Sequence, residues 1–177
     1  MIAARHRRLA VTVLALGALF GTVQAQTTRN VLVLHSYHQG LRWTDRITEG
    51  VESVLRPLSD TIELHYHYLD TKRNAGEAYY DQLVTFERFK RPFTRVEFEV
   101  IIASDNNALR FLLEHGDELY PDVPIVFCGI NNYRPEIHQG RRNITGVAET
   151  IDAAGNLALM SKLHPDRRRL LVIIDDT

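Results

Sequence analysis

Five short polar segments carry the side chains of this chain that are best suited to bind or transform a ligand. Each follows an apolar run of strand length, and together they offer hydroxyl, amide, carboxylate and aromatic groups. The segments are His35–His38, Asp70–Arg73, Ser104–Asn107, Gly129–Tyr133 and Glu149. One such segment would carry little information, because loops are polar as a rule. Five of them gathered at one edge of a sheet would predict a ligand-binding crevice.

Nine residues in or beside these segments are the candidate ligand contacts. Tyr37 and Trp43 could stack on a planar or apolar group, and Asp105 and Glu149 could receive an amine. Neighbouring basic side chains could pair with a ligand carboxylate. The full set is Ser36, Tyr37, Trp43, Asp70, Ser104, Asp105, Asn106, Asn131 and Glu149. These groups are consistent with an amino-acid-like or other small organic solute, and with many others.

His35 and Ser36, together with Asp70 or Asp105, could instead form a nucleophilic triad. However, the chain has no G-x-S-x-G elbow, and the loop after His35 is long rather than a tight, strained turn. A binding module therefore accounts for these residues better than an enzyme does. A small exported hydrolase that uses His35, Ser36 and a carboxylate remains the alternative.

His65 and His67 lie two residues apart and could chelate a metal ion from one face of a strand. Metal sites need a third and a fourth ligand at defined spacing, and the sequence shows none. Cys128, the one cysteine, ends an apolar run and is typical of a small buried hydrophobe. The formal net charge is −1, without a basic stripe that would favour nucleic acid. We therefore expect no metal, cofactor or nucleic-acid partner.

The N-terminus has the pattern of a secretory signal. Three arginines precede the largely apolar run Leu9–Phe20, and Val23-Gln24-Ala25 places small residues at the positions that a signal peptidase reads. This pattern predicts export to the periplasm with cleavage after Ala25. The alternative is an uncleaved membrane anchor, because residues 9–28 contain no charge and could just span a bilayer.

Strands alternate with helices along the rest of the chain. The expected strands are residues 31–35, 62–69, 100–103, 125–128, 144–147 and 170–174. The expected helices cover 43–56, the residues after an N-cap at Asn74, those from a cap at Ser104 or Asp105 to Gly116, and those from a cap at Asp152 to Leu163. This order predicts an α/β fold with a doubly wound parallel sheet. Apolar and polar residues alternate in 62–69, so that strand should lie at an edge of the sheet.

Helical spacing also predicts which side chains are buried. The expected apolar faces are Trp43, Ile47, Val51, Val54 and Leu55 in the first helix; Tyr79, Leu83, Phe86 and Phe89 in the second; and Ala108, Leu109, Leu112 and Leu113 in the third. Two candidate contacts therefore have a plain structural alternative. Trp43 either walls the crevice or belongs to a buried stripe, and Asp105 either contacts ligand or only caps a helix.

Several motifs in their order along the chain resemble a known family. VLVLHSYHQGLRWTDRITEGV, YLDTKR, VIIASDNNALRFL, VPIVFCGINNY and ITGVAET are similar to segments of the exported substrate-binding proteins of an uncharacterised ABC-transporter class. The same domain also serves as the periplasmic sensor of some histidine kinases and diguanylate cyclases. The resemblance implies two α/β lobes of periplasmic-binding-protein type, with a ligand held between them.

The resemblance also divides the chain. It implies a signal peptide at 1–25, a first ligand-binding lobe at 26–148, and a crossover with the start of a second lobe at 149–177. On this interpretation the chain looks truncated, and the apolar strand 170–174 would lack a sheet to join. The implied partners are a small solute and either the membrane permease of an ABC transporter or a fused or downstream signalling domain.

Overall fold

The computed structural model of the chain describes residues 28–74, 76–94, 96–138 and 140–173. The predicted signal peptide, 1–25, lies outside these residues. Among the described helices, none is long and apolar enough to cross a membrane.

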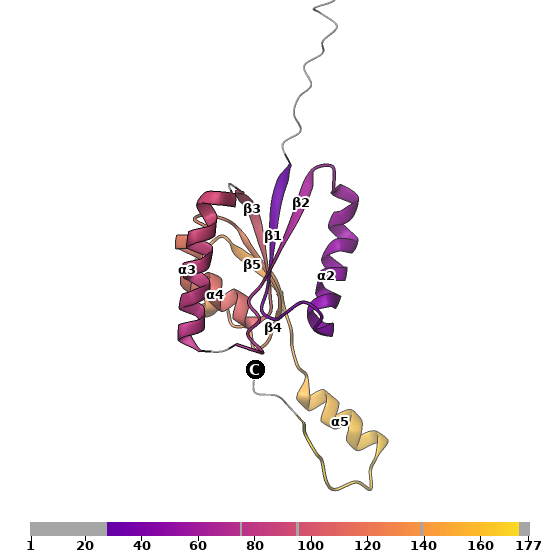
Figure 1. Cartoon of the computed structure of the whole chain (residues 1–177). Helices are drawn as coiled ribbons and strands as arrows, with labels where there is room; N and C mark the ends of the chain where they lie inside the picture. The colour runs from indigo at the N-terminus through magenta and orange to yellow at the C-terminus, as the bar shows by residue number, and fades with distance from the viewer. Residues whose placement is uncertain (1–27, 75, 95, 139, 174–177) are drawn as a thin grey trace, which may run out of the picture.

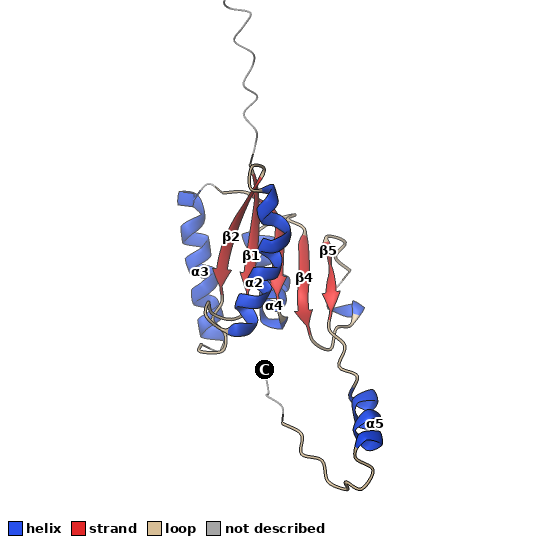
Figure 2. Cartoon of the chain, turned by 90° about the vertical axis from the view of Figure 1, so that its right-hand side faces the viewer, coloured by secondary structure: helices blue, strands red, loops and turns tan. Residues whose placement is uncertain are grey.

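Five parallel strands form a single sheet in the order β2-β1-β3-β4-β5. All five strands run in the same direction, so their carboxyl ends share one edge (Figure 2). The strands are β1 (Arg29–His35), β2 (Ile62–Tyr68), β3 (Phe98–Ser104), β4 (Ile125–Ile130) and β5 (Ile144–Ala148). The predicted α/β fold with a doubly wound parallel sheet is confirmed, and β2 lies at an edge as its alternating sequence predicts.

Helices cover the two faces of the sheet unequally. Helix α2 packs on one face, while α3 and α4 pack on the other (Figure 1). Their bounds are α2 (Arg42–Leu55), α3 (Glu77–Thr94) and α4 (Asn106–Leu119), and the single-turn helices are η1 (Arg56–Leu58) and η2 (Pro135–His138). The chain moves outward from β1 to β2, then returns across β1 to β3 and β4. Because crossovers are right-handed, this reversal of direction places α2 opposite α3 and α4.

The main core lies between the sheet and the pair α3 and α4. Leu32 and Leu34 of β1 face it, and alternate residues of the neighbouring strands continue the layer. Leu112 of α4 is fully buried against them. The other buried members include Ile101, Ala103, Ala108, Leu109, Phe111, Leu119, Ile125, Phe127, Ile130 and Ile144. This core fixes β1 and β3 side by side, with His35 opposite Ser104 at the carboxyl edge.

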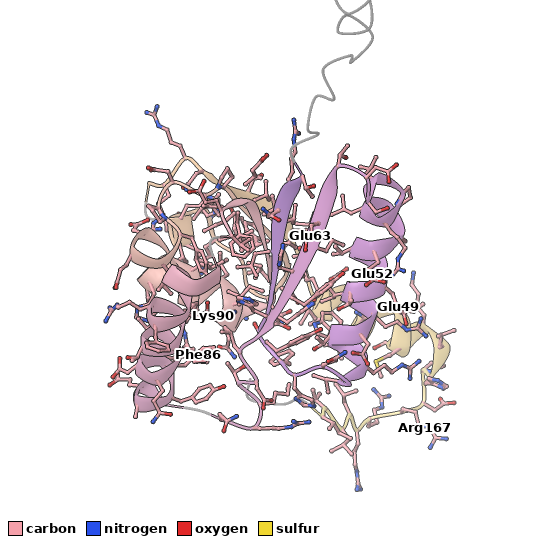
Figure 3. The ribbon with its side chains drawn as sticks, turned by 45° about the horizontal axis from the view of Figure 1, so that its top comes forward. Glu49, Glu52, Glu63, Phe86, Lys90 and Arg167 are labelled. Carbon is pink, nitrogen blue, oxygen red and sulfur yellow. The ribbon has the colours of Figure 1, made fainter. Side chains whose placement is uncertain are left out.

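The buried face of α3 differs from the prediction. Phe86 and Phe89 are 58% and 70% exposed, whereas Val84 is buried and Leu83 is half-buried. Figure 3 shows Phe86 on α3. Helix α3 begins at Glu77, so Asn74 is not its N-cap; instead, the Asn74 side chain donates to Asp70. The face of α3 that packs on the core is therefore rotated by one residue relative to the predicted face. A polar side chain, which the apolar pattern did not assign to the core, occupies an inward position.

That polar side chain is Glu87. It lies against His67 of β2 at 3.4 Å and accepts a hydrogen bond from Tyr120 at 3.3 Å. Lys90 donates to the other ring nitrogen of His67 at 2.9 Å, which requires that nitrogen to be unprotonated. Burial lowers the pKa of His67, and the Glu87 carboxylate opposes this shift. No three metal-ligating side chains cluster anywhere in the described part of the chain, His65 and His67 included.

Two other boundaries depart from the sequence prediction. Gly116 does not end its helix; it is buried within α4 with a leucine side chain beside it, and the helix continues to Leu119. Residues 170–173 form no strand, because no described strand lies beside them to supply hydrogen bonds.

Helix α5 (Ala153–Leu163) leaves the fold beyond the carboxyl edge of β5 (Figure 1). As predicted, Asp152 caps it, with its carboxylate accepting the Gly155 N–H at 2.8 Å. None of the helix's residues is buried.

Candidate ligand site at the strand ends

Asp105, the residue after β3, has the most strained backbone among the candidate contacts. Its φ of 76° and ψ of 167° fall in a region that side-chain-bearing residues rarely adopt. Its carboxylate accepts the Asn106 N–H at 2.7 Å and thereby caps α4. Its own N–H donates to the Cys128 carbonyl at 2.8 Å, which ties the turn to β4. The sequence prediction that Asp105 caps this helix is confirmed.

Two aromatic side chains lie beside the Asp105 carboxylate. The Tyr37 hydroxyl and the Trp43 indole N–H are near enough to act on its pKa as hydrogen-bond donors. Burial raises the pKa of the Asp105 carboxyl, while these hydrogen bonds and the nearby Lys72 ammonium oppose the rise. Protein donors therefore surround the Asp105 carboxyl group in place of water.

Trp43 lies at the edge of the site and outside the buried stripe of α2. Its side chain is 42% exposed, whereas the buried residue of that helix is Thr44. Of the two alternatives for Trp43, this exposure favours a place at the site over the buried stripe. In the rest of the predicted stripe, Val54 is wrongly assigned because it is 68% exposed, whereas Ile47, Val51 and Leu55 are half-buried. The indole N–H lies near the Asp105 carboxylate and the ring edge lies near Gly129, so the ring is at the strand ends.

Gly129 lies beside the Trp43 ring. A Cβ built on it would lie 3.4 Å from the Trp43 ring and 3.7 Å from the Asp105 nitrogen, which are ordinary contact distances, so it is the positive φ of 69° that favours glycine here. On the other side, the Lys72 ammonium lies 4.9 Å from the centre of the Tyr37 ring, a cation–π distance. We call Tyr37, Trp43, Lys72, Asp105 and Gly129 the strand-end cluster.

Ser36 and Ser104 hold the turns beneath this cluster. The Ser36 hydroxyl donates to the Ser104 carbonyl at 2.8 Å and accepts the Ala108 N–H at 2.7 Å. Both serines are buried. Their position therefore indicates a structural role, and direct contact between either side chain and a ligand remains an untested prediction.

His35 does not form a nucleophile–base pair with Ser36. Its Nε2 lies 3.1 Å from the Thr48 hydroxyl of α2, and its ring stacks on Tyr68 with 5.2 Å between centroids. The Ser36 hydroxyl points instead to α4. The two side chains thus face opposite sides of the sheet, a geometry that gives no support to the hydrolase alternative.

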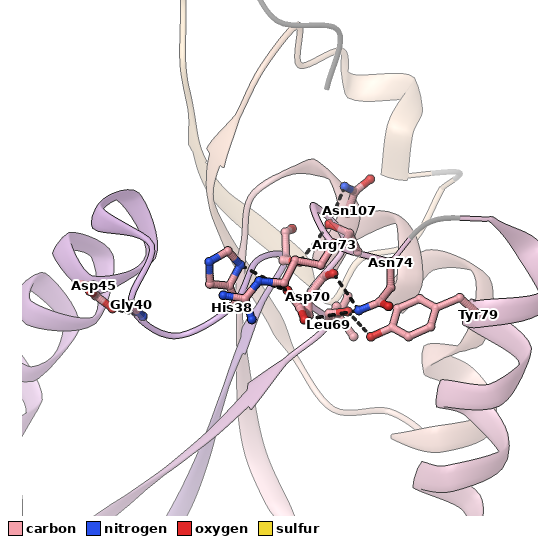
Figure 4. A network of polar contacts seen from close by, with 11 residues as sticks. His38, Gly40, Asp45, Leu69, Asp70, Arg73, Asn74, Tyr79 and Asn107 are labelled. Atoms are coloured by element: carbon pink, nitrogen blue, oxygen red, sulfur yellow. Dashed lines mark hydrogen bonds and ion pairs between the residues drawn. The ribbon is translucent and has the colours of Figure 1, made fainter.

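The loop after β2 joins the site through a polar network (Figure 4). Asp70 adopts a φ of 52°, and its Oδ1 lies 3.1 Å from His38 Nδ1 without a well-aligned hydrogen bond. Arg73 approaches the same oxygen at 3.7 Å. Thr71 donates to the Ser36 carbonyl and accepts from the Asn107 side chain, each at 2.9 Å. Asp70 therefore belongs to a neighbouring network and has no direct bond to Asp105.

The remaining candidates lie on the β4 and β5 side. Asn106 Oδ1 accepts the backbone N–H of Asn131 at 2.9 Å, so the Asn106 side chain links the turns after β3 and β4. Glu149 is exposed, and its N–H donates to the Ile130 carbonyl at 2.9 Å. Burial raises the pKa of the Cys128 thiol, and the carboxylates of Asp105 and Glu149 raise it further. Cys128 is therefore protonated and poorly nucleophilic at neutral pH.

The structure brings the predicted residues into three groups: Asp105 with Tyr37 and Trp43, Ser36 with Ser104, and Asn106 with Asn131. Asp70 and Glu149 flank them. The candidate set omitted Lys72 and Gly129. A glycine at the end of an apolar strand is a sign of close approach by another group, so Gly129 was open to prediction. The pairing of Lys72 with Tyr37 depends on loop conformation and had no sequence signal.

No family model matches this chain, and no curated protein sequence matches it significantly. The resemblance drawn from its motifs therefore enters only as a proposal.

Proposed function

We propose that this chain contributes one ligand-binding lobe of an exported small-solute binding protein. Such a protein would deliver solute to the permease of an ABC transporter or report it to a signalling domain. The observation that carries the proposal is the strand-end cluster: Asp105, with its strained backbone and buried carboxylate, lies with two aromatic side chains at the carboxyl edge of a parallel sheet.

The topology supports a ligand at this place. The crossover from β1 runs toward β2, while those after β3 run toward β4 and β5, so the direction of winding changes between β1 and β3. Ligands of open α/β sheets bind outside the carboxyl ends of strands at such a switch point. Tyr37 follows β1 and Asp105 follows β3, which places both at this switch.

The path of the chain supports a two-lobed arrangement. After β5 the chain passes beyond the carboxyl edge into α5, away from both helical layers (Figure 1). A second lobe reached along this path would face the edge that carries the strand-end cluster. A ligand held there would contact both lobes, as in hinge-closing binding proteins.

Trp43, the only tryptophan of the chain, provides the test. Amino acids, sugars, nucleosides and organic cations are titrated while its fluorescence and the heat of binding are recorded. We expect a saturable change for one class, with a dissociation constant near 1 mM (about −4 kcal/mol), because a lone lobe contacts only part of a ligand. Trp43→Ala should abolish the calorimetric signal, whereas Val54→Ala, at another exposed position of α2, should retain it.

Ester and amide hydrolysis is measured in the same samples. Turnover that disappears in Ser36→Ala, in protein that remains folded, would replace the binding proposal with the hydrolase. Absence of saturable binding by every class at 50-fold above the expected constant, about 50 mM, would contradict the proposal outright.

A further inference from the structure

We propose that Asp105 is a positioning residue: its carboxylate holds Trp43 and Tyr37 by their polar edges and so sets the aromatic wall that meets the ligand. The statement that these rings contact a ligand rests on the proposed function. The positioning itself is a property of the chain alone and can be tested without any ligand.

The hydrogen-bond pattern of Asp105 goes beyond the needs of a helix cap. A cap requires one acceptor for one or two backbone N–H groups of the first turn, and the Asn106 N–H fills that role. The indole N–H of Trp43 and the hydroxyl of Tyr37 are two further donors, and they come from separate elements. One carboxylate thus joins α2, the loop after β1 and the start of α4.

The contacts of the rings show what this junction achieves. Bonded at its nitrogen, the Trp43 ring is confined between Asp105 and the backbone at Gly129, where an added Cβ would lie 3.4 Å from the ring. It nevertheless leaves 42% of the side chain open to solvent. Tyr37 is only 8% exposed and carries the Lys72 ammonium on its ring. The carboxylate therefore fixes one buried and one open ring relative to each other.

The strained backbone conformation of Asp105 is a second sign of a role beyond capping. A φ of 76° in a residue with a side chain costs of the order of 1–3 kcal/mol unless surrounding contacts compensate. An ordinary cap forms without that conformation. Here the conformation directs the carboxylate toward the two rings while the Asp105 N–H still reaches the Cys128 carbonyl.

Asp105→Asn separates positioning from capping. Asparagine caps helices as well as aspartate does and is among the residues that best tolerate positive φ. It has lost the charge and one acceptor oxygen, and its remaining oxygen is used by the Asn106 N–H, so it should hold the indole N–H much more weakly. The emission of Trp43 should shift to longer wavelength, and quenching by acrylamide should rise about 2-fold, because a side chain that is 42% exposed becomes nearly fully exposed.

Asp152→Asn is the matched control, since Asp152 caps α5 with the same kind of carboxylate and bonds to no aromatic donor among the described residues. Its Trp43 emission and quenching should equal those of the wild-type chain. If Asp105→Asn gives wild-type emission and quenching, Asp105 is only a cap and the positioning role is wrong.

A measurement on the wild-type chain makes the inference independent of variant stability. With a single tryptophan, the indole N–H gives one nuclear magnetic resonance signal. Bonded to a buried carboxylate, this proton should exchange with water at least 10-fold more slowly than that of a free indole (1.4 kcal/mol of protection). Exchange at the free-indole rate would overturn the proposal. Binding of a solute is not involved, so failure here leaves the proposed function to its own test.

Discussion

His35 ends β1 with its imidazole sealed under α2. The side chain has no exposed surface, and its Nδ1 has no hydrogen-bond partner among the described residues. Burial lowers the pKa of the ring to about 4, against a smaller opposing effect of Asp45. The ring is therefore neutral at pH 7, and the stacked tyrosines of β2 supply its surroundings in place of charge partners.

This burial makes stability depend on pH with a definite sign. Below about pH 6.5 the unfolded chain binds a proton at His35 that the folded chain refuses, so unfolding becomes easier as pH falls. A pKa lowered to about 4 implies a loss of about 3 kcal/mol between pH 6.5 and 4. In urea unfolding across this range, the free energy of unfolding of His35→Leu should fall less steeply with pH than that of the wild type. The decline that remains in the variant comes from His67 and the carboxylates.

His164, an exposed histidine beyond α5, provides the control for that series. His164→Leu should keep the wild-type decline. An identical slope in the wild type and His35→Leu would mean that the His35 ring takes up its proton without opposition and is not sealed.

Among the elements, α3 shows that sequence periodicity can predict a helix without predicting which of its faces is buried. The presence of the helix and its approximate place follow from its pattern, because an apolar stripe of period 3.6 predicts a helix. Its orientation does not, since Glu87 occupies an inward place through His67 and Tyr120, which are distant in sequence. The same limit applies at the site: Asp105 was predictable as a cap, but its bonds to Tyr37 and Trp43 depend on loop geometry.

The rotated face of α3 predicts unequal costs for neighbouring substitutions. Val84→Ala removes buried methyl groups and should lower the free energy of unfolding by about 2 kcal/mol. Phe86→Ala removes a larger side chain that is 58% exposed, and should cost about 0.5 kcal/mol or less. Denaturant unfolding of both variants measures these losses. A greater loss in free energy of unfolding for Phe86→Ala would show that the buried face of α3 is the one predicted from spacing.

At the scale of the whole molecule, the sequence predicts a mature chain that begins at Gln26. The motivation is the Val23-Gln24-Ala25 site behind a short apolar run. N-terminal sequencing of protein recovered from the periplasm of an expressing bacterium should give Gln26 first. Exported protein that still begins at Met1 would favour the membrane anchor.

The described part of the chain consists of a packed sheet with its helices and an exposed C-terminal arm, which is α5 with residues 164–173. Residues 28–149 contain the sheet and its helices, whereas α5 and residues 164–173 are exposed throughout. Leu157, Leu159 and Leu163 are 45–65% exposed. Leu171 and Ile173 are 84% and 87% exposed. Apolar side chains at this density are rare on a solvated surface and mark a segment that packs against something further.

Expressed as residues 26–177, the chain should therefore self-associate, because the apolar arm offers an unpaired extended segment to other copies. Ending the chain at Glu149 should give a monomer that unfolds cooperatively, since the N–H of Glu149 is the last to join the fold, through the Ile130 carbonyl. Light scattering coupled to gel filtration measures both. The double substitution Leu171→Asp with Ile173→Asp serves as the control, and it should restore a monomer without shortening the chain. A long chain that is already a stable monomer with sharp thermal unfolding would show that the arm belongs to the first lobe and that the boundary at 149 is wrong.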